Sequence, residues 1–274
     1  MRDEAAEQSR VAFNAAADHY DDEPLSFHVH FGRRSVEHAQ LRPGDHVLDV
    51  ACGSGNSLVP AAEHVGPEGR VLGIDVSDRL LALCQAKAER ASLGNVELRV
   101  ADMRELDLPV RSFDAVLLVF GVFMVPDMQG LVRDLWELVR PNGRLVITVW
   151  ARGLLEPAYS AFFDAVGAQH SDLVPQNPGW LQVADPADLR ATLEGGGVPD
   201  DRIEIISEPG THELRNAEEF WTIVMGSGMR GTLDRLPTDA RERVHGQLLE
   251  VIEANGITRL PIDVHYGRAT RPGQ

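Results

Sequence analysis

The sequence lacks the features of a membrane or secreted protein. It contains no apolar run of about 18 residues, the length that a membrane-spanning helix needs, and no charged-then-apolar leader. Its only two cysteines, Cys52 and Cys84, do not stand in a metal-ligand spacing. We therefore expect no membrane span, no disulfide framework and no metal site, and we interpret both thiols as reduced and structural. This pattern is typical of a cytoplasmic protein.

Basic residues are also scarce. Lysine and arginine together number 26 against 42 aspartates and glutamates, which gives a formal net charge of −16. Because no run of basic residues offers a phosphate-binding stripe, a DNA or RNA substrate is not expected. The length of 274 residues, with 43% hydrophobic and 25% charged residues, predicts a folded domain with a sizeable core.

A glycine loop between two short apolar runs is the main signal in the chain. The runs are VLDVACGSG at 47–55 and VLGIDVS at 71–77, and an apolar helical pattern begins at Leu58. Strand, tight loop, helix and strand form a βαβ nucleotide-binding unit, in which Gly53 and Gly55 allow close approach of backbone to a ligand. Asp75 stands at the carboxyl end of the second strand, where a carboxylate can accept hydrogen bonds from a ribose diol.

Two common nucleotide sites fit this loop poorly. A dinucleotide site uses G-x-G-x-x-G, whereas this loop reads GSGNSL, and no Gly-Lys-Ser/Thr follows as in a P-loop. Asp49, inside the first strand, would repel a pyrophosphate but suits a cationic ligand that carries an amino acid. A nicotinamide-dependent oxidoreductase is thus the weaker alternative.

Further motifs follow the glycine loop in a fixed order. They are VADM at 100–103, FDAVLLVFGVFMVPD at 113–127 and VRPNGRLVITVW at 139–150. Together with the first two runs, they resemble the motifs of class I S-adenosylmethionine-dependent methyltransferases, in the small-molecule branch similar to the enzymes of ubiquinone and menaquinone biosynthesis. The resemblance covers roughly residues 40–150.

The resemblance implies an α/β, Rossmann-like fold. It predicts a seven-stranded, mostly parallel sheet with an antiparallel last strand, helices on both faces and a helical cap. We expect a single methyltransferase domain over 1–274, divided into an N-terminal cap at 1–40, a donor-binding core at 41–150, cap insertions at 151–184 and 211–237, and a last strand at 262–269. The alanines of 4–17 predict a helix, and the sequence pattern predicts further helices at 57–65, 79–92, 131–139, 158–168, 185–194 and 238–253, with a helix-rich insertion at 217–236. Strands are predicted at 96–100, 113–119, 144–150 and 203–207.

The resemblance also implies the cofactor, S-adenosylmethionine, which is converted to S-adenosylhomocysteine. It assigns the adenine amino group to the Asp102 carboxylate and a ring nitrogen to the Met103 N–H. The residues implied in cofactor binding are Tyr20, Asp49, Ala51, Gly53, Gly55, Asp75, Val76, Ala101, Asp102, Met103 and Val119.

The N-terminal segment carries the candidate bases. His28 and His30 are candidates for catalysis because an imidazole, with a pKa of about 6.5, can deprotonate a hydroxyl group. By resemblance, Tyr20 and residues 27–31 close the site, and Arg33 or Arg34 lies near the ligand carboxylate. Alternatively, Phe27 and Phe31 are simply the core side of a helix.

Other candidate residues lie later in the chain. Many relatives carry two histidines where this chain has Phe123 and Met124, so we expect an apolar wall there instead of a base. In the late insertion, Trp221, Met225 and Met229 suit either core packing or an apolar acceptor.

The predicted reaction is methyl transfer to an O, N or C atom of a small molecule, of polyketide or quinone type. A protein that binds S-adenosylmethionine without transferring the methyl group is a second alternative, because donor motifs describe binding. The oligomeric state stays open, a homo-oligomer included.

Overall fold

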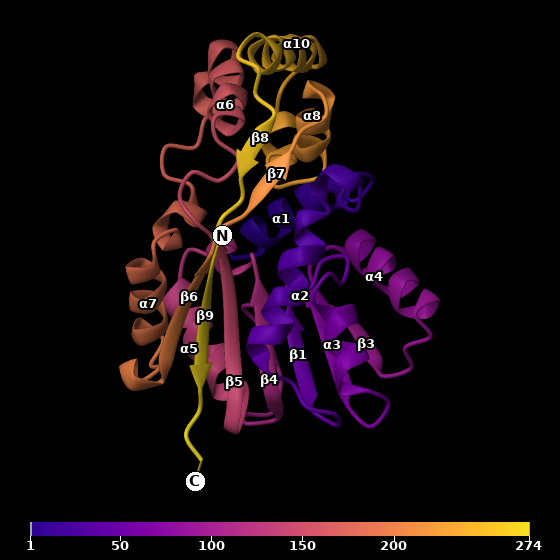
Figure 1. Cartoon of the computed structure of the whole chain (residues 1–274), viewed down its shortest axis with the longest axis vertical. Coiled ribbons are helices and arrows are strands. Elements are labelled where there is room, and N and C mark those ends of the chain that lie inside the picture. The colour runs from indigo at the N-terminus through magenta and orange to yellow at the C-terminus, as the bar shows by residue number, and fades with distance from the viewer. Residues whose placement is uncertain (1, 274) are drawn as a thin grey trace.

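Short apolar runs form the strands of one central sheet in a computed structural model that describes residues 2–273 (Figure 1). The seven strands lie in the order β3-β2-β1-β4-β5-β9-β6. All neighbouring pairs are parallel except those that β9 makes with β5 and β6. The predicted seven-stranded sheet with an antiparallel last strand is therefore confirmed. The strands are β1 (His46–Val50), β2 (Arg70–Asp75), β3 (Val96–Val100), β4 (Phe113–Val119), β5 (Val139–Trp150), β6 (Ile203–Glu208) and β9 (Val264–Thr270).

Helices cover both faces of the sheet. One face carries α2, α3 and α4, and the other carries α5 and α7. The helices are α1 (Arg2–Ala16), α2 (Phe27–Ala39), α3 (Leu58–Val65), α4 (Asp78–Arg90), α5 (Met128–Leu138), α6 (Ala158–Gln169), α7 (Pro186–Gly195), α8 (Ala217–Met225), α9 (Arg230–Leu233) and α10 (Thr238–Ala254). Short 3₁₀ helices lie at Glu23–Leu25, Val122–Met124, Ser171–Leu173, Gly179–Val183 and Asp200–Arg202.

The alternation of side chains along each strand divides the core into two layers. On β1, Val47 packs with α2 and α3, whereas Leu48 and Val50 pack toward α5 and α7. Successive side chains of a strand point to opposite faces, so every central strand feeds both layers. Asp49 lies on the same side as Val47, facing α3, and this decides its role below.

A third apolar cluster lies beyond the carboxyl ends of the strands. It joins α6, α8 and α10 to Phe27 and Phe31 of α2 and to Trp150 at the end of β5. Figure 1 shows these helices at one end of the sheet, beside α1 and a small two-stranded sheet. This second sheet pairs β7 (Thr211–Glu213) with β8 (Arg259–Pro261), and the sequence analysis did not predict it.

Most predicted elements lie within a few residues of the observed ones. Ser77 begins α4 by accepting a 3.1 Å hydrogen bond from the Leu80 N–H, as a helix cap does. The insertion at 217–236, predicted to be rich in helix, contains two helices, α8 and α9, with Gly226 as the C-cap of the first. Among the described residues, no helix combines the length and apolar character needed to cross a membrane.

Candidate functional site

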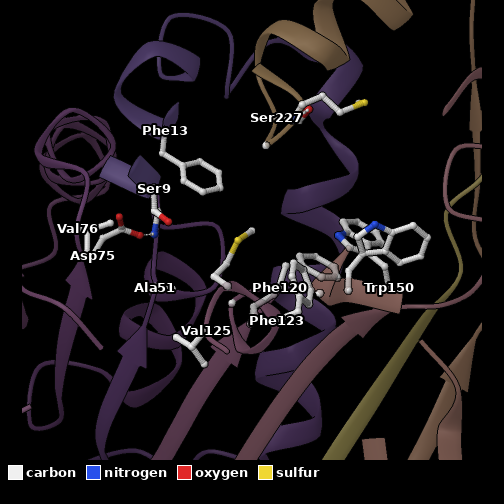
Figure 2. Close-up of a pocket in the computed structure, with 18 of the residues that line it drawn as sticks. Ser9, Phe13, Ala51, Asp75, Val76, Phe120, Phe123, Val125, Trp150 and Ser227 are labelled. Carbon is white, nitrogen blue, oxygen red and sulfur yellow. Dashed lines mark hydrogen bonds between the residues drawn. The ribbon is translucent and has the colours of Figure 1, made fainter. Parts of the chain in front are cut away.

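A cavity of about 370 Å³ lies at the carboxyl ends of β1, β2, β4 and β5. This is the edge at which open α/β sheets bind ligands. Figure 2 shows Asp75 and Val76 at one end of the cavity and Phe120, Phe123 and Trp150 at the other. The predicted site residues that line it are Tyr20, His28, Ala51, Gly53, Asp75, Val76, Ala101, Asp102, Met103 and Val119.

Asp75 is held rigidly at the end of β2. One carboxylate oxygen accepts a 2.8 Å hydrogen bond from the Gly53 N–H, and the other accepts one of 2.8 Å from the Ser77 N–H. Burial raises the pKa of Asp75, and these backbone donors act against that rise. Each oxygen keeps acceptor capacity beyond its single backbone bond, as two vicinal hydroxyl groups would require.

Asp102 and Met103 follow β3 and line the same end of the cavity. Burial favours a higher pKa of Asp102, but hydrogen bonds from the backbone N–H and guanidinium of Arg104 outweigh it and lower the pKa. The Arg104 N–H lies 2.9 Å from one carboxylate oxygen. Asp102 is therefore an anionic acceptor beside the cavity, with its side chain already oriented by its neighbour.

Two residues predicted to bind the cofactor do not reach the cavity wall. The Asp49 side chain is fully buried beneath the loop, where it accepts a 2.6 Å hydrogen bond from the Ser57 hydroxyl. Burial raises its pKa to about 7, and its Oδ1 atom has no protein partner. Gly55 packs against α4, where an added Cβ would lie 2.5 Å from Cys84 Sγ. Strand alternation directs Asp49 away from the cavity, and packing against α4 does the same for Gly55. The motif does not encode either effect.

His28 and Tyr20 form one wall of the cavity. Their rings stack with centroids 5.3 Å apart, and Phe27 lies edge-on to His28 at 4.6 Å. Burial lowers the pKa of His28 to about 4 and raises that of Tyr20, so both rings are neutral near pH 7. The buried Nδ1 of His28 has no hydrogen-bond partner in the protein.

Three other N-terminal candidates lie elsewhere. His30 is 59% exposed and contacts the Glu208 carboxylate at 3.0 Å, away from the cavity. Arg34 pairs with the same carboxylate at 2.8 Å, and neither it nor Arg33 lines the cavity. The helical spacing of α2 explains this separation, because His28 and His30 are two residues apart and point in different directions.

Phe120 and Trp150 make a flat platform at the ends of β4 and β5. Their rings are stacked 3.7 Å apart and within 3° of parallel. Phe31 meets both rings edge-on at 6.2 and 5.8 Å. Phe120 adopts a φ of 57°, which non-glycine residues rarely do, and its N–H is fixed by the Thr148 carbonyl at 2.9 Å. The sequence analysis did not single out Trp150.

The far part of the cavity is built by the cap. Tyr159 and Phe163 of α6 lie against each other at 4.9 Å, and the Trp180 N–H contacts the Tyr159 hydroxyl at 3.3 Å. Met229 also lines the cavity, as does Phe13 of α1. Trp221 does not, because it packs on His245 at 4.3 Å. Phe13, Ser9 and Ala6 recur on one face of α1, a helical spacing that could have indicated them.

Comparisons with known proteins agree with this geometry. Residues 47–143 match the family model described as methyltransferase domain. The chain is 32% identical over 202 residues to aklanonic acid methyltransferase DauC from Streptomyces sp. (strain C5), covering 69% of this chain and 91% of that protein. This chain belongs to the S-adenosylmethionine-dependent methyltransferases.

A further relative supports the membership, and a solved structure shares the fold. The methyltransferase is 34% identical over 149 residues to a demethylmenaquinone methyltransferase from Listeria welshimeri serovar 6b, covering 53% of this chain and 63% of that protein. A solved structure of a putative methyltransferase from an antibiotic biosynthesis pathway of Anabaena variabilis shares the fold, with a TM-score of 0.63 and 15% identity over 88% of this chain and 97% of that one.

The donor end of the cavity fits S-adenosylmethionine. Asp75 offers a buried, oriented carboxylate, Asp102 offers a second acceptor, and Gly53 brings backbone to the wall. The third loop glycine of a dinucleotide site is absent, because Leu58 stands in its place. The methyltransferase prediction is thus confirmed, and the oxidoreductase alternative is excluded by family membership.

Proposed function

We propose that this methyltransferase methylates an oxygen or carbon atom of an apolar, planar small molecule of polyketide or quinone type. The observation that carries the proposal is the difference between the two ends of one cavity. Of the acidic lining residues, Asp75 ends β2 and Asp102 follows the neighbouring strand β3, so both belong to the donor end. The opposite end is walled by aromatic and aliphatic side chains, with the Phe120–Trp150 platform as its flat surface.

The charge distribution favours oxygen or carbon over nitrogen as the acceptor atom. Most aliphatic amines are cations near pH 7 and lose hydration energy when they enter an apolar chamber. Among the described lining residues, no carboxylate stands beside the aromatic end to offset that loss. A neutral phenol, enol or quinone-like ring has no such cost, and it can stack on the platform.

Two relatives have names that suit this acceptor class. One is named for aklanonic acid and the other for demethylmenaquinone. The first shares an aligned stretch of 202 residues with this chain and the second a stretch of 149 residues, so the names guide the choice of test compounds. S-adenosylmethionine supplies the electrophilic methyl group when bound. The chain's own part is to align the acceptor with it in a chamber from which water is excluded.

His28 is the polar group that we assign to the acceptor. It lines the cavity between Tyr20 and the platform, 6.0 Å from the Phe120 ring centroid and 5.9 Å from that of Trp150. A neutral imidazole without a protein partner can accept the proton of a hydroxyl group of the acceptor, or donate an N–H hydrogen bond to its oxygen. We propose His28, and not His30, as the catalytic histidine.

The test is turnover of labelled S-adenosylmethionine with a panel of acceptors. Hydroxylated anthraquinones, naphthoquinols and phenolic acids are expected to yield S-adenosylhomocysteine, while aliphatic and aromatic amines of similar size are not. Turnover restricted to amines would refute the proposed acceptor class. An absence of turnover with the whole panel, in a protein that still binds S-adenosylhomocysteine, would refute it as well.

A paired substitution tests the histidine. His28→Gln is expected to lower kcat by about 10²-fold or more, the usual contribution of a positioned acid or base. His30→Gln, in an exposed position on the same helix, serves as the control and should stay within about twofold. If both variants lose activity equally, or if only His30→Gln does, the assignment to His28 is wrong.

A further inference from the structure

Lys87 stands out in the composition of the chain. It is the only lysine among 274 residues, and arginine supplies the other 25 basic side chains. Lysine carries a compact ammonium group with three diverging donors, whereas arginine presents a planar fork. This site holds the only lysine ammonium group in the chain, and its geometry suggests a specific role.

All three donors of Lys87 have acceptors. Nζ lies 2.7 Å from Asp21 Oδ1, 2.9 Å from Ser54 Oγ and 3.0 Å from Asn56 Oδ1. The Ser54 hydroxyl also donates to Asp21 Oδ1 at 2.7 Å, so Lys87, Ser54 and Asp21 form a closed ring of hydrogen bonds. We call these four residues, Asp21, Ser54, Asn56 and Lys87, the ammonium cluster.

The cluster joins two parts of the donor site that are far apart in sequence. Ser54 and Asn56 belong to the glycine loop, next to Gly53, whose N–H holds Asp75. Asp21 follows Tyr20, which forms part of the cavity wall; we call the segment that carries Tyr20 and Asp21 the cover of the site. A Cβ built on Gly53 would lie 3.3 Å from the Tyr20 hydroxyl oxygen, so cover and loop are in contact at the cavity wall.

Solvent exposure separates this cluster from an ordinary surface ion pair. The side chains of Lys87 and Asp21 are 21% and 30% exposed, and Ser54 is 1% exposed. The pair Arg79–Asp18 also links α4 to the N-terminal segment, but its side chains are 48% and 63% exposed. Exposed pairs contribute little, whereas partly buried charge-assisted hydrogen bonds contribute more.

We propose that Lys87 is a positioning residue for the methyl donor, fixing Tyr20 against Gly53 through Asp21 and Ser54. The ammonium group holds the cover in register with the glycine loop, so that the wall around the donor is preformed. This inference concerns the donor end of the cavity and does not depend on the acceptor class or on His28.

The test compares two cations of α4 that bind the same N-terminal segment. Lys87→Met is expected to weaken S-adenosylhomocysteine binding about tenfold, or 1.4 kcal/mol, and to speed its dissociation. Arg79→Met, the matched control, should stay within about twofold. Affinity is measured by calorimetry and dissociation by stopped-flow fluorescence, with ligand-free thermal unfolding recorded for both variants.

Two results would overturn the proposal. One is unchanged affinity in Lys87→Met, and the other is an equal loss in both variants, which would make the cluster a general tether. If Lys87→Met lowers the ligand-free Tm by more than a few degrees, Ser54→Ala replaces it, because this variant keeps the Lys87–Asp21 pair. Ser54→Ala is then expected to weaken binding by more than Arg79→Met, and a smaller effect refutes the proposal.

Amine chemistry provides a second, independent measurement. Reductive dimethylation keeps the positive charge of Lys87 but leaves the nitrogen a single N–H donor. The modified protein is expected to bind S-adenosylhomocysteine more weakly than the untreated protein, as Lys87→Met does. Treated and untreated Lys87→Met should bind alike, because only the terminal amine remains to react. A loss on treatment of Lys87→Met would assign the effect to that amine and overturn the proposal.

Discussion

Asp49 and Asp75 are both buried carboxyl groups on neighbouring strands, yet they face different surroundings. Asp75 receives two backbone N–H donors and stands at the cavity wall. Asp49 receives one hydroxyl donor from Ser57 and is sealed under the loop. The difference follows from position along the strand: Asp75 ends β2, whereas Asp49 precedes the last residue of β1 and faces α3. A carboxyl group sealed in this way makes stability depend on pH.

We predict that Asp49→Asn stabilises the ligand-free protein more at pH 8 than at pH 5. The pKa rises from 3.8 to about 7 on folding, so the folded state binds the proton more tightly than the unfolded state. Stability contributed by this group is complete below the unfolded pKa and is lost as the pH rises to about 7. The uncharged amide avoids that loss, which urea unfolding at both pH values would reveal.

The control for this prediction is Glu63→Gln, a change of the same charge on the exposed side of α3. It should shift stability little and without a trend in pH. If Asp49→Asn shows a flat difference between pH 5 and pH 8, Asp49 is ionised in the folded protein and the burial argument fails.

The glycine loop illustrates how one segment serves two neighbours. Gly53 gives its backbone to the cavity wall, and Gly55, at a φ of 86°, lets α4 approach until Cys84 Sγ occupies the place of a side chain. The same close approach recurs at Gly32 of α2, where a Cβ would lie 2.3 Å from the Asn56 carbonyl oxygen. The loop is therefore packed between two helices, and its shape is set from both sides.

We predict that Gly55→Ala destabilises the protein more than Gly44→Ala does. Both glycines have similar positive φ values, 86° and 88°, but nothing lies within 4 Å of a Cβ at Gly44. An alanine therefore causes a similar loss of stability through the backbone at both positions. The clash with Cys84 occurs only at position 55 and should destabilise the protein by a further amount of about 1–3 kcal/mol. If thermal unfolding shows that both variants lose equal stability, the Cys84 side chain can move aside without an energetic penalty. Adding Cys84→Ala to Gly55→Ala should recover part of the difference.

Local sequence predicted the donor end of the site better than the acceptor end. Asp75, Asp102 and Gly53 lie at strand ends and turns, which a short motif specifies. The platform needs β4 and β5 to be adjacent before Phe120 and Trp150 can stack, and periodicity carries no such information. For the same reason the sequence analysis did not find the β7–β8 pair or the partners of Lys87, which come from distant segments.

Two residues predicted to bind the donor do not line the cavity, and for a related reason. Asp49 and Gly55 stand in the motif, but the direction in which each faces depends on strand alternation and on α4 packing. Spacing places a residue near a site, and tertiary packing decides which side it presents.

The whole molecule provides the simplest check of ligand class. S-adenosylhomocysteine at about 100 times its Kd should add roughly 2.7 kcal/mol to stability and raise the Tm by a few degrees, whereas NADH should not. Asp75→Asn is the matched variant, and its loss of charge-assisted hydrogen bonds should weaken binding by about 1–3 kcal/mol and reduce the shift. A shift with NADH alone, or an undiminished shift in Asp75→Asn, contradicts the donor site as described.

The place of β9 in the sheet bears on how the chain is made. It is the last strand along the chain, yet it lies inside the sheet, paired with β5 on one side and β6 on the other. While the ribosome is still adding residues 264–270, β6 has no partner in the sheet and the edge of β5 is open. The sheet can therefore close only after residues 264–270 have been synthesised, and until then the nascent chain exposes an edge to which chaperones or other chains can bind.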